Sequence, residues 1–232
     1  MTDLLDRKVG IVACSGEQLP EGTVARLAAL RVLNELRPGE TVTICLPLFL
    51  AGGAEDRAFA RVHPTITVDG CDLRCAARGT EKYSSKPVAS LVVSELVAEQ
   101  GLPKPEGCRR LNSAGLQAVE MAAQKLAAMV DQALGPVGRK PAQGSVPAGQ
   151  ATEATCSCGS GILVRRVEID GQVVELVALD PIFRKFRDAG RGTDEATLKE
   201  VFEMVKVYND VPPAAEAAYR EAIRREFAAY CR

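Results

Sequence analysis

Short apolar runs alternate with helical stretches over the first part of the chain. Runs at 8–13, 41–45, 65–68 and 88–93 have the length and the Val, Ile and Thr content of buried strands. Between the first two runs, residues 23–36 have helical spacing, and Pro38-Gly39 predicts where that helix stops. Strands separated by helical stretches indicate an α/β fold with an open, parallel, Rossmann-like sheet and crossover helices.

A long helix and a change of composition follow. Residues 116–134 carry one apolar stripe at helical spacing, and Ser113 is positioned to cap the start of that helix. Residues 135–153 are then rich in Gly, Pro, Ala and Gln and lack large apolar side chains except valine. This composition is typical of a linker. We therefore expect an α/β domain at 1–134, a linker at 135–153 and a second domain at 154–232.

The second domain has its own pattern. Residues 162–169 and 173–178 flank Asp170-Gly171, which is a strong hairpin signal. Helices are expected at 180–189, after Thr193 as a cap, and from Pro212-Pro213 onward. The pattern indicates a small α+β domain made of a hairpin and helices.

Composition and charge exclude several classes of function. The chain is 47% hydrophobic and 25% charged, as in an ordinary globular protein, and its formal net charge is −1. A near-neutral chain with 4% aromatic residues and no Trp offers neither a basic field nor a stacking platform for nucleic acid. We find no signal-peptide pattern and no apolar run of about 18 residues, so we expect a cytoplasmic protein without a membrane partner.

Eight cysteines and a single histidine make sulfur the expected ligand type, because cytoplasmic thiols stay reduced. Cys14 and Cys71 each come after a predicted strand, and Cys45 is the last residue of another. The carboxyl ends of parallel strands share one edge of a sheet, where ligands bind. Cys75 would lie one turn from Cys71 if a helix began at 72. Four thiols suit a tetrahedral zinc site or a sulfur-ligated iron cluster, and the alternative for each cysteine alone is simple burial.

Other residues extend or limit this site. Cys156 and Cys158 open the second domain one residue apart, and two such thiols suit one soft metal ion or a labile disulfide. We include both in the candidate metal ligands. Because the linker joins them to the first domain, we expect the pair to cooperate with the four-cysteine site there. Asp69 and Asp72 are interpreted mainly as turn and helix-start residues, and His63 as a solvated loop residue. For Cys108 and Cys231 we expect no catalytic role.

Three of these motifs together resemble a known family. Cys14-Ser15-Gly16 after the first strand, Cys45-Leu46-Pro47 after the second, and Asp69-Gly70-Cys71 followed by Cys75-Ala76 are similar to the DGC-domain proteins. The resemblance covers roughly the first hundred residues and implies zinc bound by the four matching cysteines. It does not extend beyond the linker.

The sequence leaves three functions open. The first is a cysteine-based metal-binding protein, with zinc as the expected ion, in metal handling or thiol chemistry. The second is an enzyme of thiol–disulfide exchange or sulfur transfer, and the third is an iron–sulfur protein for electron transfer. The sequence assigns no catalytic residue and identifies no partner other than a metal ion.

Overall fold

A computed structural model describes residues 8–14, 16, 18–135 and 164–232. Within these residues the chain forms two compact units, each described by itself below. The first contains the described residues from Lys8 to Gly52 and from His63 onward to the end of the long helix. The second contains the C-terminal residues from 164 onward together with the short segment Gly53–Val62.

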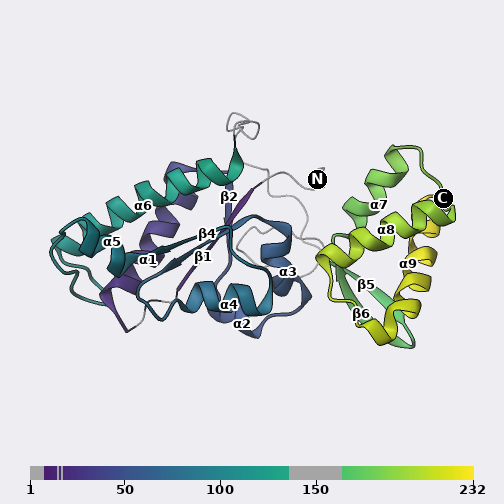
Figure 1. The fold of residues 1–232 in the computed structure, drawn as a ribbon, viewed down its shortest axis with the longest axis horizontal. Helices are drawn as coiled ribbons and strands as arrows, with labels where there is room; N and C mark the ends of the chain where they lie inside the picture. The colour runs from purple at the N-terminus through teal and green to yellow at the C-terminus, as the bar shows by residue number, and fades with distance from the viewer. Residues whose placement is uncertain (1–7, 15, 17, 136–163) are drawn as a thin grey trace. The chain divides into compact units, whose positions relative to one another are not determined.

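The first unit is built on a four-stranded parallel sheet (Figure 1). The strands, in sequence order, are β1 Val9–Ala13, β2 Thr41–Thr43, β3 Thr65–Asp69 and β4 Ala89–Val92. Their order in space is β2-β1-β3-β4. All three pairings are parallel, with Ala13 opposite Val68 at the end of β1. The predicted parallel sheet with crossover helices is therefore confirmed.

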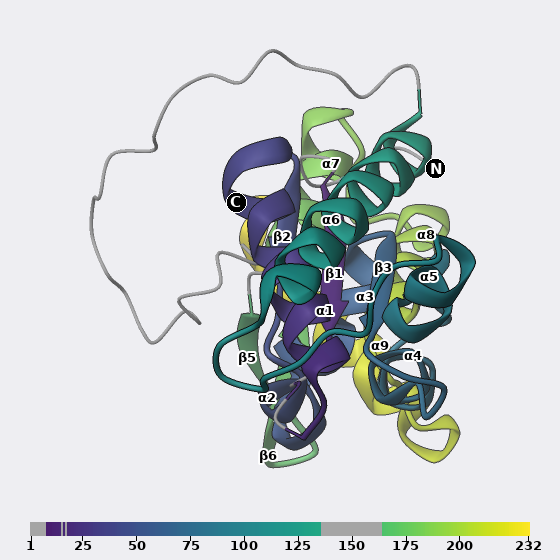
Figure 2. The same cartoon turned by 90° about the vertical axis from the view of Figure 1, so that its left-hand side faces the viewer.

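Helices cover both faces of this sheet, as Figure 1 shows. The helices of the unit are α1 Pro20–Arg31, the π-helical η1 Val32–Leu36, α2 Leu46–Ala51, α4 Cys75–Tyr83, α5 Val93–Glu99 and α6 Ser113–Leu134. α1, α5 and α6 lie on one side, whereas α2 and α4 lie on the other. Figure 2 shows α6 passing over α1, its principal contact. Ile11, Ile66, Val24 and Leu126 are all fully buried in the core between sheet and helices. This burial explains the valines and isoleucines of the strands, and β2 and β3 also carry the buried threonines Thr41, Thr65 and Thr67.

The C-terminal unit combines a hairpin with helices, as predicted. It contains α3 Ala54–Val62, β5 Val164–Ile169, β6 Gln172–Val177, α7 Leu179–Asp188, α8 Glu195–Tyr208, the 3-10 turn η2 Pro213–Ala215 and α9 Glu216–Tyr230. β5 and β6 pair antiparallel around the Asp170-Gly171 turn. Phe183, Phe202 and Phe227 are fully buried in the core that the helices form with this hairpin.

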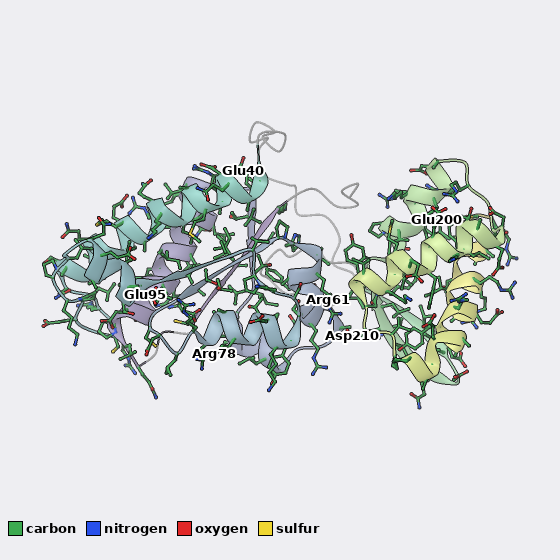
Figure 3. All side chains as sticks on the ribbon, in the orientation of Figure 1. Glu40, Arg61, Arg78, Glu95, Glu200 and Asp210 are labelled. Carbon is green, nitrogen blue, oxygen red and sulfur yellow. The ribbon has the colours of Figure 1, made fainter. Side chains whose placement is uncertain are left out.

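α3 is the part of this unit that the sequence pattern did not indicate. It lies between β2 and β3 in sequence, yet it contacts β6 and α8. Ala58 and Phe59 are buried on it, and Arg61 makes a 2.7 Å ion pair with Asp210 (labelled in Figure 3). The predicted boundaries of the α/β domain, the linker and the small domain stay a prediction, because the predicted linker lies almost entirely outside the described residues.

Two predicted helix caps are wrong by one residue. The side chain of Asn112, and not Ser113, accepts the hydrogen bond from Gly115 N at the start of α6. Asp194, and not Thr193, accepts from Thr197 N at the start of α8. In both cases two cap-forming residues are adjacent, and the backbone path before the helix decides which one serves. No described helix is long and apolar enough to cross a membrane.

Asn209 and Asp210 provide a test of what holds the C-terminal unit together. Asn209 is 7% exposed, its Oδ1 accepts from Val177 N at 2.8 Å, and its Nδ2 donates to Val177 O and Val205 O at 3.1 and 2.9 Å. We expect Asn209→Ala to lower the free energy of unfolding by about 1–3 kcal/mol. The substitution leaves the buried backbone groups of Val177 and Val205 without their side-chain hydrogen-bond partner. Chemical denaturation of the purified protein measures this change.

The neighbouring Asp210 is the matched control. Its side chain is 81% exposed in the pair with Arg61, so Asp210→Ala should change the free energy of unfolding by no more than about 1 kcal/mol. Equal losses for the two variants would contradict the role of the Asn209 hydrogen bonds.

Candidate functional site

The strand order reverses between β1 and β3, and the candidate site lies where these two strands end. In an open α/β sheet such a switch point leaves a crevice outside the carboxyl ends of the strands. Cys14 follows β1 directly, and Gly70 and Cys71 follow β3. Gly70 N donates a hydrogen bond to Cys14 Sγ at 3.3 Å, so residues 56 positions apart in sequence meet at this edge.

Glycine backbone forms the wall beside Cys14. A Cβ placed on Gly70 would lie 2.5 Å from Gly22 N and 2.7 Å from Gly22 Cα, and Gly22 is in the first turn of α1. Gly16, at a φ of +70°, meets the backbone of Gly22 equally closely. The segments of Gly16, Gly22 and Gly70 thus touch without side chains between them. This contact brings the start of α1 close to the carboxyl edge of the sheet, where Cys14 lies.

Asp69 is buried, with 1% of its surface exposed, and caps α4 from a distance. Its Oδ1 accepts from Ala76 N at 2.7 Å and its Oδ2 accepts from Ala77 N at 3.1 Å. Burial raises the pKa of the Asp69 carboxyl, while these two hydrogen bonds and Arg74 act in the opposite direction. The interpretation of Asp69 as a structural residue agrees with these contacts, whereas Asp72 is exposed in the turn before α4.

Cys71 and Cys75 lie on either side of a tight turn. Arg74 N donates to Cys71 O at 3.1 Å, Arg74 takes a left-handed φ of 50°, and α4 begins at Cys75. The condition that a helix begins at 72 is therefore not met, and Cys71 precedes the helix. Cys71 is half-buried, while Cys75 is exposed at the first position of α4.

The three thiols Cys14, Cys71 and Cys75 are close enough to influence one another. Burial raises the pKa of the Cys14 thiol above its ordinary value, the hydrogen bond from Gly70 lowers it, and the charges of Asp69, Cys75 and Cys71 raise it further. A protonated Cys14 is consequently favoured in the free protein. A cation at this edge would reverse that preference, because it stabilises thiolates.

The remaining predicted ligands are arranged differently. Cys45 is the N-cap residue of α2 and is exposed. Cys156 and Cys158 lie outside the described residues. Among the residues that the structure describes, no group of three or more His, Cys, Asp or Glu side chains is arranged to hold a metal ion. The metal-ligand role of all six cysteines stays a prediction.

His63 was expected in a solvated loop, and this expectation is wrong. The residue is 4% exposed, and its carbonyl oxygen accepts a 2.8 Å hydrogen bond from Thr65 Oγ1. It precedes β3, whereas Cys71 follows β3, so His63 lies toward the opposite edge of the sheet. The sequence did not indicate that His63 is buried, because a His-Pro pair occurs both in exposed loops and in buried ones.

Cys108 lies near the site, which sequence spacing did not indicate. Its carbonyl oxygen is 2.5 Å from Thr23 Oγ1, and the same hydroxyl is 3.1 Å from Gly16 O. The loop that carries Cys108 is closed by Asn112 N donating to Glu106 O at 3.0 Å. The half-buried Cys108 is therefore anchored beside the first turn of α1. Only tertiary packing reveals this neighbour.

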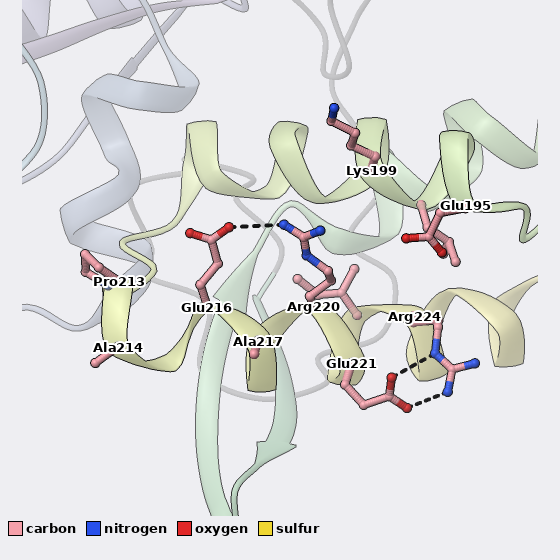
Figure 4. Close-up of a pocket in the computed structure, with 11 residues that line it drawn as sticks. Glu195, Lys199, Pro213, Ala214, Glu216, Ala217, Arg220, Glu221 and Arg224 are labelled. Atoms are coloured by element: carbon pink, nitrogen blue, oxygen red, sulfur yellow. Dashed lines mark hydrogen bonds and ion pairs between the residues drawn. The ribbon is translucent and has the colours of Figure 1, made fainter.

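A groove of about 860 Å³ between α8 and α9 is a different kind of surface (Figure 4). Leu198 and Ile223 contribute apolar surface to it, and charged side chains of both helices line it. Arg220 pairs with Glu216 at 3.1 Å, and Arg224 pairs with Glu221. Two arginines of the groove are thus paired with carboxylates of the same helix, and no cysteine lines it. The carboxyl edge of the parallel sheet therefore remains the candidate site.

Gly70→Ala tests the close backbone approach between Gly70 and Gly22. The added Cβ would meet backbone atoms of Gly22, which have no rotamer with which to move away, so we expect a loss of about 1–3 kcal/mol or more in the free energy of unfolding. Gly192→Ala is the matched control, since Gly192 has open space around it and no left-handed φ. Equal unfolding midpoints for the two variants would show that the close approach is absent.

Comparison with known proteins bears on this edge of the sheet. No curated protein and no solved structure matches the chain. The family model of the DGC domain matches residues 10–126, just over half of the 232 residues. The match begins within β1 and ends within α6, so it spans the described strand ends and the Asp69-Gly70-Cys71 triplet. The chain belongs to the DGC domain family.

Proposed function

We propose that this protein binds a thiophilic metal ion, zinc first among them, through the cysteines at the carboxyl edge of the sheet. One observation carries the proposal: Cys14, Cys71 and Cys75 come from two strand ends to one switch point, where Gly70 N already donates to Cys14 Sγ at 3.3 Å. Membership of the DGC family supports it, because the matched residues 10–126 contain all three cysteines.

The chemistry of the donors fits such an ion. Sulfur is the donor of three neighbouring side chains, and thiolates select zinc, Cu(I) or iron clusters over magnesium and calcium. The arrangement of the described residues does not itself surround an ion. Binding therefore requires the turn of Cys71 and the side chain of the exposed Cys75 to adjust, since β1 and β3 are fixed by their pairing. Cys45, Cys156 and Cys158 are the proposed sources of further sulfur.

Metal binding accounts for the environment of Cys14 better than nucleophilic catalysis does. A reactive thiol needs a depressed pKa, and burial and neighbouring negative charges raise that of Cys14. A bound cation would supply the positive charge that allows adjacent thiolates to coexist. We propose metal handling in the cytoplasm, where such thiols stay reduced. Thiol exchange, sulfur transfer and an iron–sulfur cluster are the competing outcomes of the test.

We expect the full chain, purified without oxygen, to contain about one zinc ion, measured by metal analysis and by competition with a chelator. Cys14→Ser, Cys71→Ser and Cys75→Ser should each weaken zinc binding by more than the roughly 10–100-fold typical of losing a group that only supports a ligand. Cys45→Ser and the double change of Cys156 and Cys158 to serine decide which sulfurs complete the site.

Cys231→Ser is the matched control, because Cys231 is a half-buried cysteine at the end of α9 and should leave zinc affinity unchanged. Retention of stoichiometric zinc by all three edge variants would refute the shared site. A brown protein that bleaches in air would identify an iron–sulfur cluster instead. Thiols that titrate equally with and without a chelator, in protein free of metal, would favour thiol chemistry.

A further inference from the structure

We propose that Asp69 is a positioning residue of the thiol site, which fixes Cys75 by holding the first turn of α4 with both of its carboxylate oxygens. The inference rests on the proposed metal-binding function for its meaning, but part of its test needs no metal. Asp69 is 1% exposed and belongs to β3, whereas Cys75 is exposed at the start of the next helix.

The hydrogen bonds run from the residues that follow Cys75 directly. Ala76 N donates to Asp69 Oδ1 at 2.7 Å, and Ala77 N donates to Oδ2 at 3.1 Å. The N-cap position of α4 is occupied by Arg74, whose side chain makes no cap hydrogen bond. The carboxylate of Asp69 therefore takes over the task that a local cap performs in other helices.

This arrangement connects the thiols through backbone. β3 pairs with β1 up to Ala13 opposite Val68, which sets Asp69 beside Cys14. From Asp69 one path leads through the hydrogen bonds to the turn of Cys75, and another leads through Gly70 N to Cys14 Sγ. The position of Cys75 relative to Cys14 thus depends on two carboxylate contacts as well as on the turn of residues 71–74.

The choice of an aspartate at this place also has an electrostatic consequence. A buried carboxylate against a helix N-terminus offsets the positive end of that helix. Asp69 consequently holds the first turn of α4, and with it the backbone of Cys75, by its charge as well as by its two hydrogen bonds.

Asp69→Asn is the primary test, because asparagine keeps the size of the side chain while it removes the charge and replaces one acceptor by a donor. In metal-free protein, alkylation of Cys75, followed by peptide mass spectrometry, should become severalfold faster relative to Cys231. In the same variant, zinc affinity measured with a competing chelator should fall by about 10–100-fold. Cobalt substitution should show weaker thiolate-to-metal charge-transfer absorption.

Thr80→Val is the matched control on the same helix. Thr80 is also fully buried, but its hydroxyl makes no hydrogen bond to any residue that the structure describes, so the variant should keep wild-type alkylation of Cys75 and wild-type zinc affinity. Wild-type alkylation and affinity in a folded Asp69→Asn protein would overturn the positioning role. If Asp69→Asn does not fold, amide hydrogen exchange of wild-type Ala76 and Ala77 replaces it, and zinc should slow that exchange.

The two proposals fail in different ways. A wild-type protein that binds no zinc would refute the metal site, while faster alkylation of Cys75 in Asp69→Asn would still support its positioning by Asp69. The positioning role alone would be refuted by two results together. The wild-type protein would bind zinc without a change in the amide hydrogen exchange of Ala76 and Ala77, and the Asp69→Asn variant would match the wild-type protein in zinc affinity and in alkylation of Cys75.

Discussion

Backbone contact between the ends of β1 and β3 and the start of α1 determines where the thiols lie. Gly70 approaches Gly22 so closely that a single methyl group would meet backbone atoms at 2.5 Å. Such an approach is open only to glycine, and it removes the side chains that would otherwise separate Cys14 from the segment after β3. The 3.3 Å hydrogen bond from Gly70 N to Cys14 Sγ lies beside this contact, where the pairing of β1 with β3 brings the two residues together.

The Asp-Gly-Cys triplet has a separate physical role at each position. Asp69 ends β3 inside the protein and supplies acceptors to α4, Gly70 permits the contact with α1, and Cys71 starts the turn that leads to Cys75. The order matters because each residue faces a different neighbour. Exchanging Asp69 and Gly70, for example, would put a carboxylate against the backbone of Gly22 and leave the first turn of α4 without its acceptor.

The parts of the fold that could be predicted are those set by local pattern. The parallel strands, α6 and the hairpin of β5 and β6 follow from apolar periodicity and from Asp170-Gly171. The contact of Cys14 with Gly70 could be expected from strand ends, but its tightness could not, since it depends on glycines in three separate segments. The neighbourhood of Cys108 and the burial of His63 depend on loop paths, which no periodicity encodes.

The helix α3 shows a further limit of reading domains from composition. Its residues, Ala54–Val62, lie inside the stretch that matches the DGC family, yet they pack with β6 and α8, which lie outside that stretch. Within the described residues, the chain therefore passes between the compact units at Gly52-Gly53 and at Val62-His63. Because Phe59 is fully buried on α3, removal of the C-terminal residues would expose an aromatic side chain between Cys45 and β3. The C-terminal unit thus buries a segment, α3, that the family match already contains.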